Sequence, residues 1–200
     1  MMFTADLVYS YCTTVSGGPG LKVQCPDQMY AQGWCSSGKD KNCCTGRCSH
    51  ELKCCSTYEV PRNHCYNIYG HYGEFIKCDA DSAVVGACGS GENADCSARF
   101  LDEMYNKTGL MPDEEARGGS YTVAYCCEHG KTVSPNGYWF TQGCGFDVSC
   151  RPNQFMQGLC GSGKNGDCGN IPNVRQGTMP EPRCSNGGHH TAIYCADILD

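Results

Sequence analysis

The chain has 200 residues, twenty cysteines and a formal net charge of −6. Its fifteen basic residues form no basic run, which argues against nucleic acid or an anionic membrane surface as a partner. No stretch of about 18 apolar residues is present, so the sequence predicts no membrane-spanning helix.

The composition points to a core that is held by disulfides. Seven Leu, five Ile, ten Val and six Phe are far fewer than a globular domain of this length normally carries. An even number of cysteines at this density is typical of disulfide scaffolds made in oxidising compartments. Only Cys44-x3-Cys48, with His50 nearby, has a zinc-like spacing. We therefore expect a secreted protein without a metal or other cofactor.

One cysteine pattern, C-x9-C-x7-C, occurs three times without insertion or deletion, at residues 25–43, 78–96 and 150–168. Each copy has a glycine two residues before its middle cysteine (Gly33, Gly86, Gly158) and a Ser-Gly pair after it. Such agreement indicates an internal repeat. The repeats span about 12–60, 61–130 and 131–200, and no single one holds enough apolar residues to fold alone. We expect one domain, 1–200, with a shared core.

Strand patterns recur in each repeat. In the first, Leu21, Val23 and Cys25 alternate with polar residues, and short strands are expected at 28–33 and 50–54. In the second, the strands are expected around Ile76 and Cys78, at 83–86 and at 121–126. In the third, they are expected at 146–150, 154–158 and 191–195. These patterns predict an all-β, disulfide-rich fold with pseudo-threefold symmetry.

An insert in the second repeat interrupts this pattern. Ser97 can cap a short helix that ends at Gly109, with four apolar residues on one face: Phe100, Leu101, Met104 and Tyr105. The same insert holds the only N-x-[ST] sequon, Asn106-Lys107-Thr108, which predicts N-glycosylation at Asn106.

The repeat spacing also predicts disulfide pairs. The turn of each repeat is closed by Cys35–Cys43, Cys88–Cys96 and Cys160–Cys168. The strands of each repeat are joined by Cys25–Cys54, Cys78–Cys126 and Cys150–Cys195. The eight remaining cysteines fall in even numbers in each repeat, so all twenty are expected to be oxidised, with no bridge between repeats.

Three short segments resemble a known family. Residues 69–78 (YGHYGEFIKC) resemble the aromatic-Gly-x-aromatic-Gly run that leads to a cysteine in the vitelline membrane outer layer protein I family. Cys25-Pro26-x3-Tyr30-Ala31-x-Gly33 is similar to the family's segment directly after that cysteine, and residues 191–195 (TAIYC) are similar to the family's repeat ending. The resemblance implies a secreted β-prism of three sheets, known from egg envelopes, in which glycan recognition is suspected. This chain has far more cysteine than that family, so the resemblance bears on the fold more than on the function.

Candidate sites are of two kinds. The repeated turns carry oxygen-bearing side chains that could ligate calcium or a sugar, although a Gly-Asx turn closed by a disulfide explains the same residues: Asp40, Asn42, Asn93, Asp95, Asn165 and Asp167. The aromatic residues Tyr138 and Trp139, and the group Tyr66, Tyr69 and Tyr72, could stack on sugar rings or fill the core.

No catalytic motif stands out. The chain has no G-x-S-x-G and no H-E-x-x-H, and His189-His190, Asp79 with Asp81, and residues 113–115 are read as solvated loop residues. The sequence thus favours a non-enzymatic, secreted structural or matrix component, whose partners are coat components or its own copies. A glycan-binding, lectin-like module is the alternative, and a defence or toxin protein is a third.

Overall fold

The computed structural model describes residues 11–17, 21–36, 43, 50–56, 60–70, 74–88, 96, 122–142, 147–160 and 191–199. These residues form strands and turns, with no helix among them. Accordingly, no helix that could cross a membrane is found in this part of the chain. The short helix expected from Ser97, and the sequon at Asn106, lie outside the described residues.

The described chain is all β. Its strands are β1 (Cys12–Gly17), β2 (Val23–Gln24), β3 (Met29–Ser36), β4 (His50–Ser56), β5 (Asn63–Gly70), β6 (Ile76–Lys77), β7 (Ser82–Cys88), β8 (Thr122–Glu128), β9 (Thr132–Val133), β10 (Tyr138–Gln142), β11 (Val148–Ser149), β12 (Gln154–Cys160) and β13 (Thr191–Leu199).

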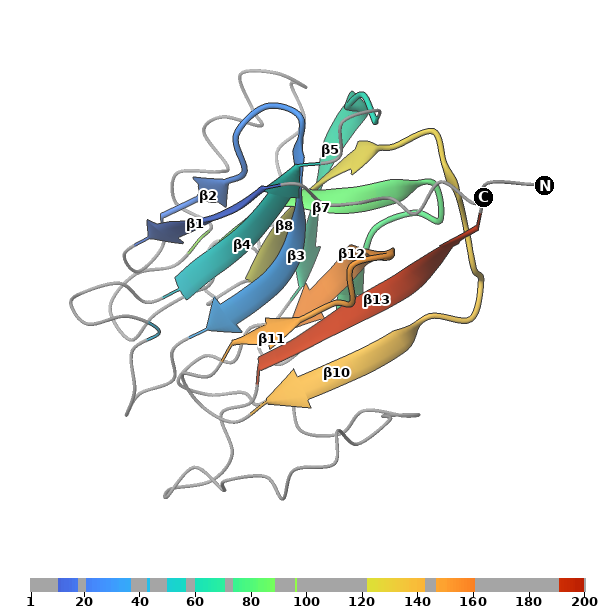
Figure 1. Cartoon of the computed structure of the whole chain (residues 1–200). Coiled ribbons are helices and arrows are strands. Elements are labelled where there is room, and N and C mark those ends of the chain that lie inside the picture. Colours follow the sequence, from blue (N-terminus) through green and yellow to red (C-terminus); the bar gives the residue numbers. More distant parts are fainter. Residues whose placement is uncertain are drawn as a thin grey trace.

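The strands form three sheets, and the repeats exchange strands in a ring. The sheet orders are β1-β4-β3-β11, β5-β8-β7-β2 and β10-β13-β12-β6, with β9 pairing beside β13. Each sheet takes three long antiparallel strands from one repeat and a two-residue strand from another. The first repeat lends β2 to the second, the second lends β6 to the third, and the third lends β11 to the first. The three sheets therefore surround a common interior (Figure 1).

The repeated glycines are the points where the lent strands dock. Gly33, Gly86 and Gly158 each follow a β-bulge in the central part of their sheet and pair with the lent strand. A Cβ on Gly158 would lie 2.6 Å from the carbonyl oxygen of Ile76, and one on Gly33 would lie 2.8 Å from that of Val148. Because both neighbours are backbone atoms, only glycine allows the lent strand to approach this closely.

The bulge residue before each glycine binds the strand cysteine of the neighbouring repeat. The amide of Cys25 donates to Val85 O at 2.8 Å, that of Cys78 to Gln157 O at 2.7 Å, and that of Cys150 to Gln32 O at 2.7 Å. Two bulge side chains extend these contacts: Gln32 Nε2 donates to Gln154 O, and Gln157 Nε2 donates to Ala80 O at 2.9 Å. Each repeat is thereby hydrogen-bonded to the next.

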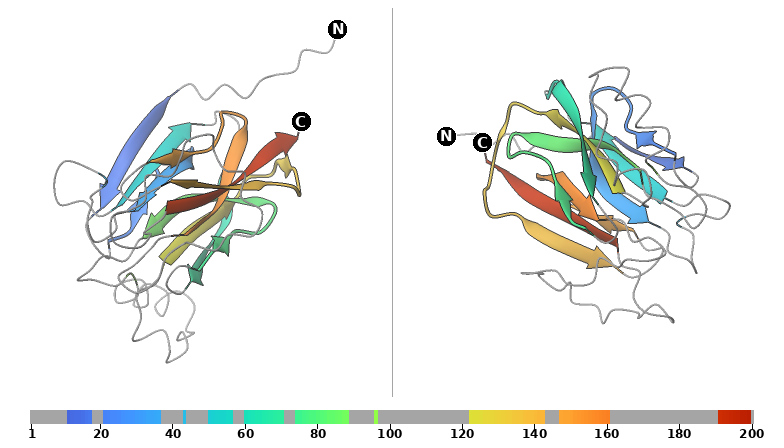
Figure 2. Two further views of the ribbon diagram at one scale, coloured as in Figure 1. Left: turned by 90° about the horizontal axis from the view of Figure 1, so that it is seen from below. Right: turned by 180° about the vertical axis from the view of Figure 1, so that it is seen from behind.

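One cluster of buried residues is drawn from all three repeats, as the composition predicts. Alongside Trp34, Leu52 and Ile193 it includes the six strand cysteines, which form the bridges Cys25–Cys54, Cys78–Cys126 and Cys150–Cys195. Figure 2 shows from two further sides how the three sheets enclose this interior. The core bridges join cysteines 29, 48 and 45 residues apart in sequence. By the chain-entropy model, a bridge that closes a loop of such length stabilises the fold by about 4 kcal/mol, so disulfides replace part of the missing aliphatic core.

Two turn bridges also join the pairs that the repeat spacing predicts, Cys35–Cys43 and Cys88–Cys96. Cys160 is disulfide-bonded as well, but its predicted partner Cys168 lies outside the described residues. Two further bridges, Cys12–Cys55 and Cys65–Cys127, use cysteines that the spacing left unassigned. All seven described bridges lie within a repeat.

The structure corrects the strand assignment in two ways. The strands expected to end at Gly33, Gly86 and Gly158 continue to the middle cysteine of each motif, because the chain forms a bulge at the glycine rather than a turn. Hydrophobic alternation also missed β1, β5 and β10, which are edge strands of the sheets. Each edge strand packs on the core through only one or two partly buried residues, so the alternation there is weak: Val15 in β1, Tyr66 and Ile68 in β5, and Phe140 in β10.

The docking contact makes a graded prediction. Gly158→Ala should destabilise the fold by about 2 kcal/mol, since the new methyl group would overlap the backbone of Ile76. Gly86→Ala is the matched control, because its Cβ would lie 3.0 Å from Val23 O and needs a much smaller shift. Urea unfolding of both variants measures the difference. Equal losses of stability would contradict the closer backbone overlap at Gly158 as the cause of its larger loss.

Candidate functional site

The outer faces of the three sheets can be compared at equivalent positions. A row of four residues crosses each sheet through the repeat glycine, and we call it the outer row. The rows are Thr14, Lys53, Gly33 and Ser149 in the first sheet; Asn67, Tyr125, Gly86 and Gln24 in the second; Trp139, Tyr194, Gly158 and Lys77 in the third. Only the glycine is common to all three, so the outer faces differ chemically.

The outer row of the third sheet is aromatic. Trp139 meets Tyr194 edge-to-face with 5.3 Å between ring centroids, and Phe75 meets Trp139 in the same way at 4.8 Å. Lys77 Nζ lies 4.0 Å from the centroid of the Tyr194 ring, within cation–π range. Trp139 and Phe75 are partly exposed. Phe75 and Lys77 belong to the second repeat, so strand exchange assembles this face from two repeats. We call these four residues the aromatic face.

Sequence reasoning found only part of the aromatic face. It named Trp139 together with Tyr138, but neighbouring residues of a strand point to opposite faces of the sheet. Tyr138 pairs with the buried Cys195, and Phe140 packs against the core, so Tyr138 lies on the inner side. Tyr66 and Tyr69 are separated in the same way: Tyr66 packs on the shared core, whereas Tyr69 packs on the Cys88–Cys96 bridge. Tyr72 lies outside the described residues.

The outer row of the first sheet forms a small polar pocket. It measures about 40 Å³ above Gly33 and is lined by Thr14, Glu51, Lys53, Asp147 and Ser149. A space of this size accommodates a water molecule rather than a sugar ring. In the outer row of the second sheet, Tyr125 stands at the position of Lys53. Lys22 Nζ lies 4.0 Å from the centroid of the Tyr125 ring.

The predicted oxygen-rich turn residues lie outside the described residues, as do His189 and His190. Asp79 and Asp81 are described, and both lie exposed at a turn in which Ser82 N donates to Asp79 O at 3.0 Å. Within the described part of the chain, no three His, Cys, Asp or Glu side chains are grouped as a metal site requires.

Two of the histidines that the structure describes are buried. His50 Nε2 lies 2.6 Å from Leu21 O and its ring packs against Trp34, while His129 stacks on Phe155 with 4.3 Å between centroids. Burial lowers the pKa of each imidazole to about 4. The amide of Lys131 donates to His129 Nδ1 at 3.1 Å, which leaves the ring hydrogen on the buried Nε2. Both side chains are therefore neutral packing residues at neutral pH.

Comparison with protein families, curated proteins and solved structures finds no match to this chain.

The buried histidines make stability depend on pH. Their pKa is about 4 in the folded state and near 6.5 when unfolded, so the unfolded chain binds more protons between these values. Each histidine should contribute its full share to the free energy of unfolding above pH 6.5. This share, about 3 kcal/mol for each histidine, should be lost as the pH falls from 6.5 to 4. Urea midpoints between pH 7 and 5, where few carboxylates titrate, measure the slope. His129→Phe should reduce that slope, and an unchanged slope would exclude His129 as a contributor.

Proposed function

We propose that this protein is a secreted, non-enzymatic structural or matrix component of an extracellular assembly, with coat components or further copies of itself as partners. We also propose that its three sheets form a β-prism with pseudo-threefold symmetry, an arrangement supported by the ring of strand exchange. The disulfides require an oxidising compartment for their formation, which is consistent with secretion.

The observation that carries this proposal is the role of the repeated residues. The cysteines join strands in the core, and the glycines allow the lent strands to dock. In contrast, the glycine is the one outer-row residue common to all three sheets, and Tyr125 and Tyr194 match only between the second and the third. Three equivalent binding sites would have kept equivalent ligand contacts, because repetition then adds avidity. The repeated residues thus support a rigid scaffold better than a multivalent binder.

Rigidity of this kind should be visible in proteolysis. We expect the native protein to resist digestion at neutral pH and to become susceptible when a strong thiol reductant is added with mild denaturant, because the core bridges then open. Digestion with and without reductant, read on a gel, measures this. Rapid cleavage inside the sheets of the oxidised protein would contradict the proposal.

A second candidate function, glycan binding, is favoured by the aromatic face. Partly exposed Trp139 and Phe75, held in fixed edge-to-face contact, offer apolar ring surface beside the ammonium group of Lys77. Such a surface can stack on a sugar ring. It occurs on one sheet among the three, so any binding would be monovalent and weak.

A glycan array separates the two candidates. On the structural proposal we expect weak or no binding across sugar classes. Micromolar binding of one sugar class would favour the lectin instead, provided that Trp139→Ala abolishes it. Thr14→Ala is the matched control, since Thr14 occupies the position of Trp139 in the outer row of the first sheet.

A further inference from the structure

Two of the seven described disulfides differ from the other five in their place in the sheets. Cys12–Cys55 and Cys65–Cys127 each join an edge strand to its neighbour, with Cα atoms 4.0 and 4.1 Å apart. In the other described bridges the Cα atoms lie 5.4–5.9 Å apart. Both edge bridges share a central strand with a core bridge, since Cys54-Cys55 and Cys126-Cys127 are adjacent pairs.

Cys65 and Cys12 are the exposed ends of these bridges. Cys65 is exposed, whereas its partner Cys127 is fully buried. The neighbouring core bridge has no such access, because Cys78 and Cys126 are 3% and 0% exposed. A thiolate in solution can therefore reach one sulfur of the Cys65–Cys127 bridge and neither sulfur of Cys78–Cys126.

The backbone around Cys65 is also less regular than the backbone around Cys12. The pairing of β5 with β8 shifts between Asn63 and Tyr66, and His64 within the shift has a φ of 36°, a region that costs a non-glycine residue of the order of 1 kcal/mol. In contrast, β1 pairs with β4 without interruption at Cys12, and the ladder continues with Ser56 N donating to Tyr11 O at 2.8 Å. The backbone that carries Cys65 is thus paired less regularly with its neighbouring strand than the backbone that carries Cys12.

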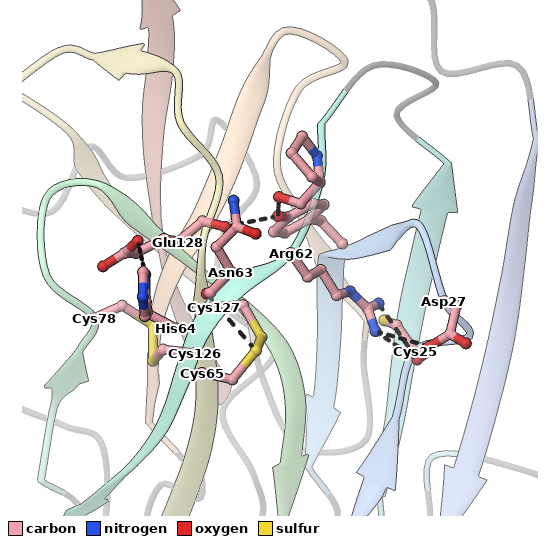
Figure 3. The surroundings of a disulfide bond; sticks show 12 residues. Cys25, Asp27, Arg62, Asn63, His64, Cys65, Cys78, Cys126, Cys127 and Glu128 are labelled. Atoms are coloured by element: carbon pink, nitrogen blue, oxygen red, sulfur yellow. Dashed lines mark hydrogen bonds and ion pairs between the residues drawn. A yellow bond between two sulfur atoms is a disulfide. The ribbon is translucent and has the colours of Figure 1, made fainter.

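The structure around the bridge retains other ties if the bridge opens. His64 Nδ1 lies 2.7 Å from Glu128 Oε2, and Asn63 pairs with Glu128 in the sheet (Figure 3). Just before β5, the Arg62 guanidinium donates to Pro26 O at 2.7 Å, which anchors the strand to the first repeat. These ties hold residues 62–64, and the pairing of Tyr66 with Cys126 holds the other end of the irregular segment.

The third repeat shows that the fold does not require a bridge at this position. Ala196 pairs with Phe155 as Cys127 pairs with Ala83, so alanine stands where the second repeat has its buried edge cysteine. Tyr138 pairs with Cys195 as Tyr66 pairs with Cys126, so the residues before these tyrosines are equivalent. Gly137 therefore stands where the second repeat has Cys65. The third sheet thus forms without an edge bridge at this position.

We propose that Cys65–Cys127 is a thiol–disulfide exchange site, through which this chain can be joined covalently to an external thiol. The thiolate of that thiol attacks the Cys65 sulfur, a new sulfur–sulfur bond forms to Cys65, and the electron pair of the broken bond leaves with Cys127 as a thiolate. The step consumes no oxidant or reductant beyond the attacking thiol. The reverse attack by Cys127, held beside Cys65 by the sheet, restores the bridge and releases the thiol. This inference holds whichever of the two candidate functions applies.

The test treats the native protein with reduced glutathione, without denaturant, and traps free thiols by alkylation at successive times. Peptide mass mapping should find glutathione on Cys65 and the alkyl label on Cys127, at a rate roughly tenfold or more above that of Cys78–Cys126. Cys12–Cys55 should react more slowly than Cys65–Cys127. Equal rates for Cys65–Cys127 and Cys78–Cys126, earlier opening of Cys12–Cys55, or glutathione on Cys127 would overturn the proposal.

The double variant Cys65→Ala, Cys127→Ala provides the matched control. It should keep the near-ultraviolet circular dichroism of the native protein, as Gly137 and Ala196 of the third repeat lead us to expect, and should lose the fast phase of glutathione uptake. A fast phase that persists in the folded variant would place the reactive bridge elsewhere. If the variant does not fold, the mapping of reaction rates on the native protein decides the question.

Discussion

The close contact between each repeat glycine and the two-residue strand lent by a neighbouring repeat is the constraint on which the rest of the structure depends. It brings Val23, Ile76 and Val148 into the interior and places the following cysteine next to its bridge partner. A side chain at the glycine would push the lent strand away, and with it one end of a core disulfide. Because the lending runs in a ring, each repeat depends on one neighbour and supports the other.

Disulfides and strand exchange compensate together for a small aliphatic core. A repeat with so few Leu, Ile, Val and Phe residues buries too little apolar surface to fold alone. The three strand bridges, one in each repeat, lie inside the shared core and contribute both buried sulfur and loop closure. The two edge bridges have a different position, at the rim of the first and second sheets, where solvent reaches one cysteine of each pair. Core and edge bridges can therefore differ in reactivity within one compact molecule.

The docking of the lent strands and the core disulfides restrict the residues on the inner side of the sheets. The side chains on the outer faces are not restricted in this way and differ between the sheets. Polar residues surround Gly33, a lysine and a tyrosine cover the second sheet, and aromatic rings lie on the third. The aromatic face also depends on the exchange, because β6 brings Lys77 next to Tyr194 from another repeat. Surface chemistry of this fold is thus set by pairs of repeats rather than by single repeats.

The sequence by itself determined the class of the protein: the repeats, the all-β character, the shared core and five of the six pairs of motif cysteines come from spacing and from alternation. Those features are local or periodic, so a single chain reveals them. Only the tertiary structure decided which repeat lends a strand to which, since no residue at 23–24, 76–77 or 148–149 specifies its partner sheet. For the same reason the sequence could name Trp139 but not its neighbours Phe75 and Lys77, which are more than 60 residues away along the chain. It also left Cys12, Cys55, Cys65 and Cys127 unpaired, because their pairing depends on strand register, and register exists only once β1 and β5 lie against their sheets.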